Sequence, residues 1–247
     1  MFKKRLKSFW EKLRLKAKFC RLIFNCFDID YRRRTIEVSF SQTGEDIISL
    51  FLLRSFGVYV PSYLDIGANH PIHLSNTYLM YLLGGRGINI EPDPEIAEMI
   101  RRVRPDDVTI NAGVGADEDE KDFFIMSTNV ANTFIRSEAE ELERRDGNCI
   151  KRVVRVPVRK ITNLLNEHQI HPDFISLDVE GMDLEILKSL NWEWRRPKVI
   201  CVETIDYFTQ KKRTEILEFL ACKGYALHAD TFINTIFKDS TAKQCLH

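Results

Sequence analysis

Apolar and polar positions change their spacing several times between residues 63 and 92, the most informative stretch of this chain. An apolar run, Tyr63–Asp65, ends in a carboxylate and is followed at once by a turn of small residues, Gly67–Asn69. Apolar residues then recur at helical spacing, a Gly-Gly pair interrupts them, and a second apolar run ends at Glu91. The order strand, turn, helix, strand within about 30 residues is typical of one βαβ unit.

The same alternation continues to the end of the chain. Parallel strands buried on both faces are continuous apolar runs, whereas helices repeat their apolar positions every three or four residues. The last two predicted strands are joined by a gap so short that only an antiparallel pair allows it. The predicted helices are 47–56, 94–103, 161–167, 183–190 and 211–222, and the strands after the first unit are 108–115, 123–126, 152–158, 173–178, 198–203, 225–231 and 235–238. The sequence therefore predicts an α/β fold with a seven-stranded, doubly wound, mostly parallel sheet and an antiparallel C-terminal hairpin.

One segment departs from this alternation. Residues 129–148 are polar, helical in their middle, and carry no apolar pattern of their own. We interpret about residues 127–150 as a surface excursion that covers a bound substrate.

Composition fits a globular protein, but the charge is unevenly distributed. The chain of 247 residues has 44% hydrophobic residues and a formal net charge of zero, yet residues 1–34 hold 12 Lys/Arg against 3 Asp/Glu. We therefore expect a basic arm, residues 1–38, before an acidic domain, residues 39–247. The six cysteines lack metal-binding spacing, and no apolar run approaches the roughly 20 residues that span a bilayer. These features predict a cytoplasmic protein with reduced thiols.

The arm itself has the pattern of a basic amphipathic helix. Phe, Leu and Trp residues follow helical spacing through residues 2–24, with lysines between them. Such helices lie at the surface of anionic membranes, so peripheral association with the inner face of the membrane is one hypothesis. The alternative is that the helix packs on protein and its lysines are simply solvated.

Acidic residues that end buried strands indicate the chemistry of the domain. Open α/β sheets bind ligands beyond the carboxyl ends of their strands, where a carboxylate such as Glu91 can accept hydrogen bonds from a ribose diol. A dinucleotide site would require three glycines after the first strand, whereas Gly67-Ala68-Asn69-His70 holds one. The stretch is therefore interpreted as a site for a nucleoside without a pyrophosphate. The polar cluster Ser41–Asp46 either caps the following helix or forms a lid over this site.

These motifs resemble those of the FkbM-type methyltransferases, a family of class I enzymes that depend on S-adenosylmethionine. The resemblance covers residues 39 to 239 and leaves the basic arm outside. Its matching segments are SQTGED (41–46), YLDIGANHP (63–71), LSNTY (74–78), GINIEPDP (87–94), RPDDVTINAGVG (104–115), FISLDVEGMDLEILKS (174–189) and NTIF (234–237). The resemblance implies a Rossmann-like fold and methyl transfer to a hydroxyl of a sugar, polyketide or similar metabolite, with polysaccharide biosynthesis as one setting.

The resemblance also implies roles for individual residues. The methionine portion of the cofactor would meet the first loop, the ribose would meet Glu91, and the adenine would lie near Asn111 and Ala112. The implied cofactor-binding residues are Gln42, Gly44, Glu45, Asp46, Asp65, Gly67, Ala68, Asn69, Asn76, Thr77, Glu91, Pro92, Asn111 and Ala112.

Methyl transfer to an alcohol also needs a group that removes the hydroxyl proton. Asp178 or Glu180, at the end of the fourth parallel strand, is our candidate base. A second hypothesis is that Asp178 and Glu203, with Asp206 nearby, bind Mg²⁺ and acidify the alcohol. The weaker base candidates are His70 and His73, whereas His171 is interpreted as a turn residue.

Two other functions remain open at this point. A nucleic-acid methyltransferase would explain the basic arm, although an acidic domain repels a polyanion and the Asp178-Val179-Glu180-Gly181 turn differs from that of many amino-group methylases. The second open function is a catalytically silent scaffold that binds a membrane or a partner through its arm. The expected acceptor is a small-molecule or glycan hydroxyl.

Overall fold

The structure is a computed structural model that describes residues 38–179, 181–193 and 196–244. By its internal contacts the chain divides into two units, Met1–Val38 and Ser39–His247, and the second holds the sheets and helices described here. The predicted amphipathic helix of the arm lies outside the described residues. Within the described ranges, no helix is long and apolar enough to cross a bilayer.

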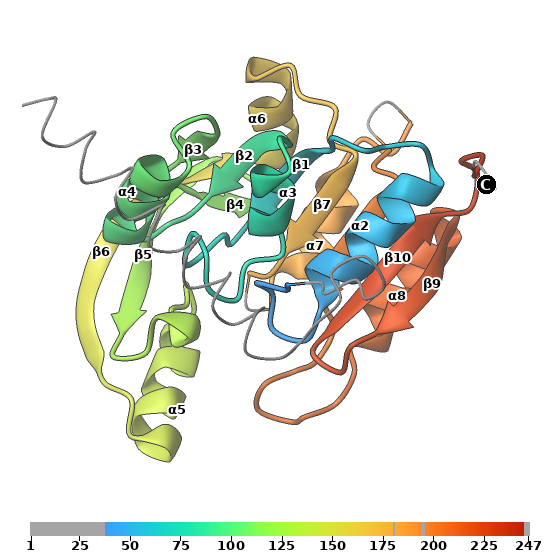
Figure 1. Ribbon diagram of the computed structural model, residues 1–247. Helices are drawn as coiled ribbons and strands as arrows, with labels where there is room; N and C mark the ends of the chain where they lie inside the picture. Colours follow the sequence, from blue (N-terminus) through green and yellow to red (C-terminus); the bar gives the residue numbers. More distant parts are fainter. Residues whose placement is uncertain (1–37, 180, 194–195, 245–247) are drawn as a thin grey trace, which may run out of the picture. The chain divides into compact units, whose positions relative to one another are not determined.

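A seven-stranded sheet forms the centre of the domain (Figure 1). Its strand order is β3-β2-β1-β7-β8-β10-β9, and the first five strands are parallel. Strand β10 runs antiparallel to both of its neighbours. The strands are β1 (Ser62–Ile66), β2 (Arg86–Ile90), β3 (Val108–Ile110), β7 (Phe174–Leu177), β8 (Val199–Glu203), β9 (Tyr225–Asp230) and β10 (Asn234–Asp239). The predicted doubly wound sheet with an antiparallel C-terminal hairpin is confirmed.

Helices cover both faces of this sheet because its strands are apolar on both sides. Tyr63 of β1 packs with Leu53 of α2 on one face, whereas its neighbour Leu64 belongs to the core shared with Leu220 of α8 on the other. Figure 1 looks onto the face covered by α2 and α3. The helices of the first face are α2 (Glu45–Ser55) and α3 (Tyr78–Leu82), and those of the second are α6 (Ile161–Glu167), α7 (Asp183–Ser189) and α8 (Thr214–Cys222).

Helix α4 (Pro94–Val103) follows β2 and has the bounds that the sequence predicts. The Asp93 side chain accepts a hydrogen bond from the Glu95 backbone N–H at 2.9 Å, and Pro94 occupies the first turn, where no intrahelical N–H is lost. Ile96 and Ile100 of this helix pack with Ala68, just after β1. The helix therefore supports the first loop from the side.

The predicted strand 108–115 is wrong: the structure divides it into β3 and β4 (Gly113–Gly115), which belong to different sheets. The division falls at Asn111, whose side-chain N–H group donates to the backbone carbonyls of Glu91 and Pro92, each at 2.8 Å. A Cβ on Gly113 would lie 2.5 Å from the Phe134 ring, so glycine is required where the chain crosses. The hydrogen bonds of Asn111 and the close contact between Gly113 and Phe134 accompany the passage of the chain from one sheet to the other.

The second sheet has three strands in the order β4-β6-β5, with β5 (Asp119–Met126) antiparallel to β6 (Ile150–Lys160). The chain between β5 and β6 forms a short 3₁₀ helix, η1 (Asn129–Ala131), and α5 (Arg136–Asp146). Although the sequence shows no apolar pattern in this segment, the structure gives it a small core. Ala139 and Leu142 of α5 are buried against Phe124 and Met126 of β5. Two apolar positions three residues apart suffice to cover a narrow ribbon, but they give a weak signal in the sequence.

Candidate active site

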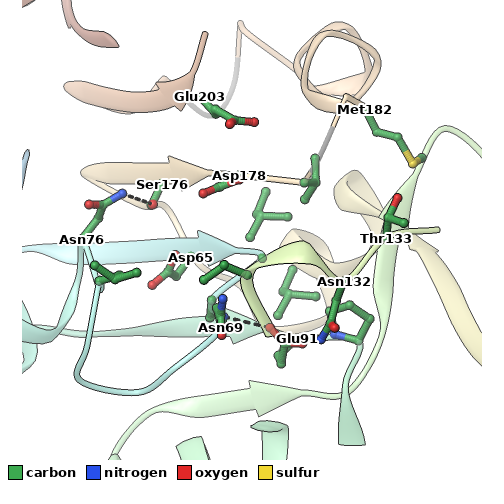
Figure 2. A pocket seen from close by; sticks show the side chains of 18 of the residues that line it. Asp65, Asn69, Asn76, Glu91, Asn132, Thr133, Ser176, Asp178, Met182 and Glu203 are labelled. Atoms are coloured by element: carbon green, nitrogen blue, oxygen red, sulfur yellow. Dashed lines mark hydrogen bonds between the residues drawn. The ribbon is translucent and has the colours of Figure 1, made fainter. Parts of the chain in front are cut away.

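A cavity of about 360 Å³ opens at the carboxyl ends of the parallel strands. Four acidic side chains line it: Asp65 and Glu203 near the ends of β1 and β8, and Glu91 and Asp178 directly after β2 and β7 (Figure 2). Among the described residues that line it there is no Lys, Arg or His. The cavity therefore has a negative potential that favours a cationic ligand over an anionic one.

The loop after β1 depends on a glycine. Gly67 has φ +78°, and a Cβ at this position would lie 1.9 Å from the backbone carbonyl oxygen of Asp178. The backbone N–H groups of Gly67 and Ala68 both donate to the Ile90 carbonyl, at 3.0 and 3.1 Å. The loop is thus pressed between the ends of β2 and β7, and a larger residue would force these strand ends apart.

Glu91 is fixed by backbone donors on both of its oxygens. Oε2 accepts from the Asn69 N–H and Oε1 from the Asp93 N–H, each at 2.8 Å (Figure 2 shows the former). Each carboxylate oxygen can accept a second hydrogen bond, so capacity remains for two hydroxyl groups of a ligand. The side chain is 4% exposed, and this burial raises the pKa of Glu91 to about 7.

Asp65 belongs to a buried polar network that the sequence did not reveal. Its carboxylate accepts a hydrogen bond from the Thr77 hydroxyl, which in turn accepts from Arg104 at 2.8 Å. Arg104 is 1% exposed and also donates to the Pro71 carbonyl and to the Asn89 side chain. Burial raises the pKa of Asp65, and the positive charge of Arg104 opposes that rise. The hydrogen bond from Thr77 holds the Asp65 carboxylate in place, and Asp65 also lines the cavity.

Asp178 lies where β7 ends. Its backbone N–H donates to the Ile66 carbonyl at 3.1 Å, which ties the end of β7 to that of β1. The side chain is open to the cavity yet lies deep within the domain, and this depth, together with the negative charges of Asp183 and Asp65, raises its pKa to about 7. A carboxylate with this pKa can accept a proton near neutral pH.

Other lining residues come from connections outside the parallel strands, and sequence reasoning did not single them out. The hairpin loop Thr231–Ile233 and the connection between β8 and α8 supply several of them. Residues 129–134, within the predicted substrate cover, also face the cavity. The lining residues that we had not proposed for the site include Leu74, Asn129, Val130, Asn132, Thr133, Phe134, Ser176, Met182, Tyr207, Gln210, Phe232 and Asn234.

Ser176 could have been found from its place in β7, two residues before Asp178. Its hydroxyl accepts a hydrogen bond from the Asn76 side chain at 3.1 Å (Figure 2). The loop residues have no comparable signal, because only the fold brings them to the cavity.

Most of the proposed cofactor-binding residues line the cavity, and five do not. Those that line it are Gln42, Asp65, Gly67, Ala68, Asn69, Asn76, Glu91, Pro92 and Ala112, together with the candidate base Asp178. The residues that do not line it are Gly44, Glu45, Asp46, Thr77 and Asn111. Of the two candidate bases, Glu180 lies outside the described residues.

Glu45 and Asp46 hold the segment before α2 in place. Asp46 accepts from the Ser39 hydroxyl at 2.6 Å and from the Phe40 N–H at 2.7 Å. Burial of Glu45 acts to raise its pKa, but hydrogen bonds from Thr43 and Thr231 outweigh this effect and hold the pKa at about 2. Within the cluster Ser41–Asp46, Gln42 lines the cavity, and Glu45 and Asp46 hold the cluster in place.

The magnesium hypothesis is not supported by the geometry. The Asp206 carboxylate accepts from the backbone N–H and the hydroxyl of Thr209, both at 2.8 Å, and lies 3.9 Å from Arg213. Within the described ranges, no group of three or more metal-ligating side chains comes together. Asp178 and Glu203 line the cavity without Asp206.

The histidines contribute little to the site. His70 Nδ1 accepts hydrogen bonds from the backbone N–H groups of Ile72 and His73. Neither His70 nor His73 lines the cavity. His171 precedes β7, and its carbonyl accepts from the Ser62 hydroxyl at 2.9 Å.

Comparisons with known proteins found one matching family model and several solved structures of low similarity. The sequence model of the methyltransferase FkbM domain matches residues 65–227. No curated protein matches the chain significantly. A precorrin-6y C5,15-methyltransferase from Geobacter metallireducens is similar at 17% identity over 85% of this chain and 95% of that one, with a TM-score of 0.43.

Two further solved structures have lower TM-scores. An O-methyltransferase from Bacillus cereus shares 16% identity over 83% of this chain and 82% of that one, with a TM-score of 0.38. A magnesium protoporphyrin IX methyltransferase from Synechocystis shares 11% identity over 89% and 94% of the two chains, with a TM-score of 0.37.

Proposed function

The chain belongs to the methyltransferase FkbM domain family, and from that premise we propose that this S-adenosylmethionine-dependent methyltransferase transfers the methyl group to a hydroxyl of a sugar, a glycan or a related metabolite. The observation that carries the proposal is the position of Asp178, a carboxylate beside the first loop in an acid-lined cavity.

The residues of the cavity fit the cofactor that the family uses. S-adenosylmethionine supplies an electrophilic methyl group on a positively charged sulfur. The acids that line the cavity suit this charge, Glu91 retains hydrogen-bonding capacity for the ribose hydroxyls, and Gly67 allows the first loop to pack closely against Asp178. Ala112 and Pro92 offer small, apolar contacts for the adenine.

Asp178 is proposed as the general base. An alcohol is a weak nucleophile, and removal of its proton by a carboxylate held in the cavity raises its reactivity. Because its depth within the domain and the negative charges of Asp183 and Asp65 raise the pKa of Asp178 to about 7, the carboxylate is basic enough for this task, whereas an ordinary aspartate is a weaker base. Its connection to Ile66 keeps it beside the cofactor loop. This arrangement favours transfer to oxygen.

A nucleic-acid substrate has less support. The acid-lined cavity repels a phosphate backbone. The arginines of β6 are paired with acids, for example Arg155 with Asp122 at 3.3 Å and Arg159 with Glu167 at 2.5 Å. The basic arm is the feature that favours a nucleic-acid substrate, and the binding partner of the arm is considered separately.

For the arm, we propose association with anionic membranes. Removal of residues 1–27 should abolish binding to vesicles that contain phosphatidylglycerol and leave S-adenosylmethionine affinity unchanged. Vesicle co-sedimentation of the full-length and shortened chains would measure this. Vesicle binding that persists in the shortened protein would show that the arm is not the anchor.

The proposed reaction is tested by transfer of a labelled methyl group to a panel of sugars, lipids and RNA. We expect transfer to hydroxylated sugars, and we expect Asp178→Asn to slow it by about 10²- to 10⁴-fold while the Kd for S-adenosylmethionine changes little. Preferential methylation of RNA would overturn the proposed substrate class. Cofactor binding without transfer to any acceptor would favour the silent scaffold.

A further inference from the structure

Strained backbone is concentrated around the cavity. Five described residues other than glycine have positive φ: Asn69, Leu74, Gln169, Gln210 and Phe232. All of these except Gln169 line the cavity. Bulky side chains rarely adopt this conformation, and where they do, the surrounding structure imposes it, most often at functional sites.

Phe232 is the most unusual of them. Its φ is +76°, it lies in the loop between β9 and β10, and its side chain is 64% exposed although it lines the cavity. The Phe232 N–H donates to the Asp230 carboxylate at 2.8 Å, and the neighbouring Thr231 hydroxyl donates to the buried Glu45 at 2.7 Å. Glycine would fit this backbone without strain, so neither packing nor local conformation accounts for a phenyl ring here.

A second exposed ring lines the same cavity from the connection after β8. Tyr207 is 50% exposed, and its ring meets that of Phe208 edge to face at a centroid distance of 5.5 Å. Phe208 packs against the small core of β5 and α5, which supports the connection from below. The Gln210 side chain donates to the Tyr207 carbonyl at 2.7 Å, so the turn that carries the ring is tied to itself.

The polar side chains that line the cavity determine which ligands could bind to these two aromatic rings. One face of a sugar ring presents C–H bonds, which are weakly positive and pack well against the negative face of an aromatic ring. The amide side chains of Asn129 and Gln210 can hydrogen-bond to hydroxyl groups. A phosphate or carboxylate on the acceptor would meet acids and no lining cation among the described residues.

We propose that Phe232 and Tyr207 form the acceptor platform of this enzyme, two exposed rings that bind a sugar ring by its apolar face and disfavour acceptors that carry an anionic group. The inference rests on the proposed function, because it concerns the acceptor of the same reaction. It assigns the choice of acceptor to residues outside the cofactor loop.

Saturation-transfer NMR on the full-length protein saturated with S-adenosylhomocysteine tests the platform. The probes are the methyl glycosides of glucose, mannose and fucose, with glucose 6-phosphate as the anionic counterpart. The variants are Phe232→Gly, which removes the ring and also the backbone strain, and Phe51→Ala. Phe51 is the matched control, because it is 65% exposed on α2 and does not line the cavity.

We expect saturation of the ring protons of at least one neutral glycoside, and none for glucose 6-phosphate. Phe232→Gly should lower this signal about fivefold or more, as the loss of one stacking contact predicts, with S-adenosylhomocysteine affinity and thermal midpoint no lower than in the wild type. Phe51→Ala should leave the signal unchanged.

Each contrary result identifies what fails. No glycoside signal, an equal signal from glucose 6-phosphate, or full signal in Phe232→Gly would overturn the platform and leave the methyltransferase assignment intact. A folded protein that does not bind S-adenosylhomocysteine would overturn the proposed function, and the platform with it.

Discussion

At one end of the cavity, the polar groups are fixed by neighbours on several sides, whereas the opposite side is formed by loops. The first region, here called the cofactor end, comprises Asp65, Gly67–Asn69 and Glu91, which lie at or just after the ends of parallel strands and are hydrogen-bonded to buried partners. The second, the acceptor side, comprises residues 129–134, 207–210 and 232–234, which come from three separate connections.

This difference separates two tasks of the enzyme. A region built on strand ends cannot vary without disturbing the sheet, so it suits a cofactor shared by a whole family. Loops held at their bases can change their side chains without such a cost, so they suit an acceptor that differs between enzymes. Substitutions at the cofactor end should therefore damage cofactor binding or stability, and substitutions at the acceptor side should damage neither.

The largest effect is expected at Gly67. Gly67→Ala would place a Cβ 1.9 Å from the Asp178 carbonyl at a φ of +78°, so we expect loss of S-adenosylmethionine binding and a fall of about 3 kcal/mol or more in the unfolding free energy. Urea denaturation and calorimetric titration would measure both.

The control for this substitution is Gly147→Ala. Gly147 also has positive φ, +67°, but no atom of the described residues would lie within 4 Å of a Cβ at this position. The substitution should cost only about 1 kcal/mol and spare cofactor binding. Equal effects of the two substitutions would contradict the close approach of β1 and β7.

A smaller effect is expected at Glu91. Glu91→Ala removes the proposed acceptor of the ribose hydroxyls, so the Kd for S-adenosylmethionine should rise about tenfold or more. Glu95→Ala is the control, because the Glu95 side chain is 77% exposed and pairs with Arg152. Unchanged affinity in Glu91→Ala would move the ribose contact elsewhere.

The smallest effect concerns pH. Burial raises the pKa of Glu91 from 4.5 to about 7, so the folded state favours the protonated carboxyl. Its contribution to stability is complete below pH 4.5 and is lost as pH rises through 7. Glu45, with a pKa of about 2, titrates below this window.

Unfolding free energies of the ligand-free protein at pH 4.5, 6 and 7.5 would measure this loss. Glu91→Gln should make the profile shallower, while Asp178, whose pKa is also about 7, maintains part of the slope. Bound S-adenosylmethionine should offset the loss because its positive charge favours the ionised carboxyl. The burial of Glu91 would be contradicted if the unfolding free energy of the wild type, but not that of Glu91→Gln, rose between pH 4.5 and 7.

Much of the cofactor end could be predicted from the sequence because it is local. Asp65 and Glu91 each end a continuous apolar run, and the carboxyl ends of parallel strands meet at one edge of a sheet. Arg104 could not be predicted, since a long cation near a helix end is usually solvated, and only the folded chain encloses it among Thr77, Asn89 and Pro71.

The acceptor side could not be predicted because its residues share no period and no motif. Phe232 and Tyr207 look like ordinary residues of two loops, and the strain at Phe232 is a property of the backbone alone. The division of residues 108–115 between two sheets was missed for a related reason: side-chain bonds of Asn111 and the Phe134 ring against Gly113 determine it, and both are tertiary contacts.

Calorimetric titration of S-adenosylmethionine into the purified full-length protein tests the central claim most directly, that the acid-lined cavity is a cofactor site. The account predicts binding with a Kd on the order of micromolar in the wild type, together with a marked loss in Glu91→Ala. No binding by a protein shown to be folded would contradict it, and the domain would then be a scaffold with the architecture of a methyltransferase.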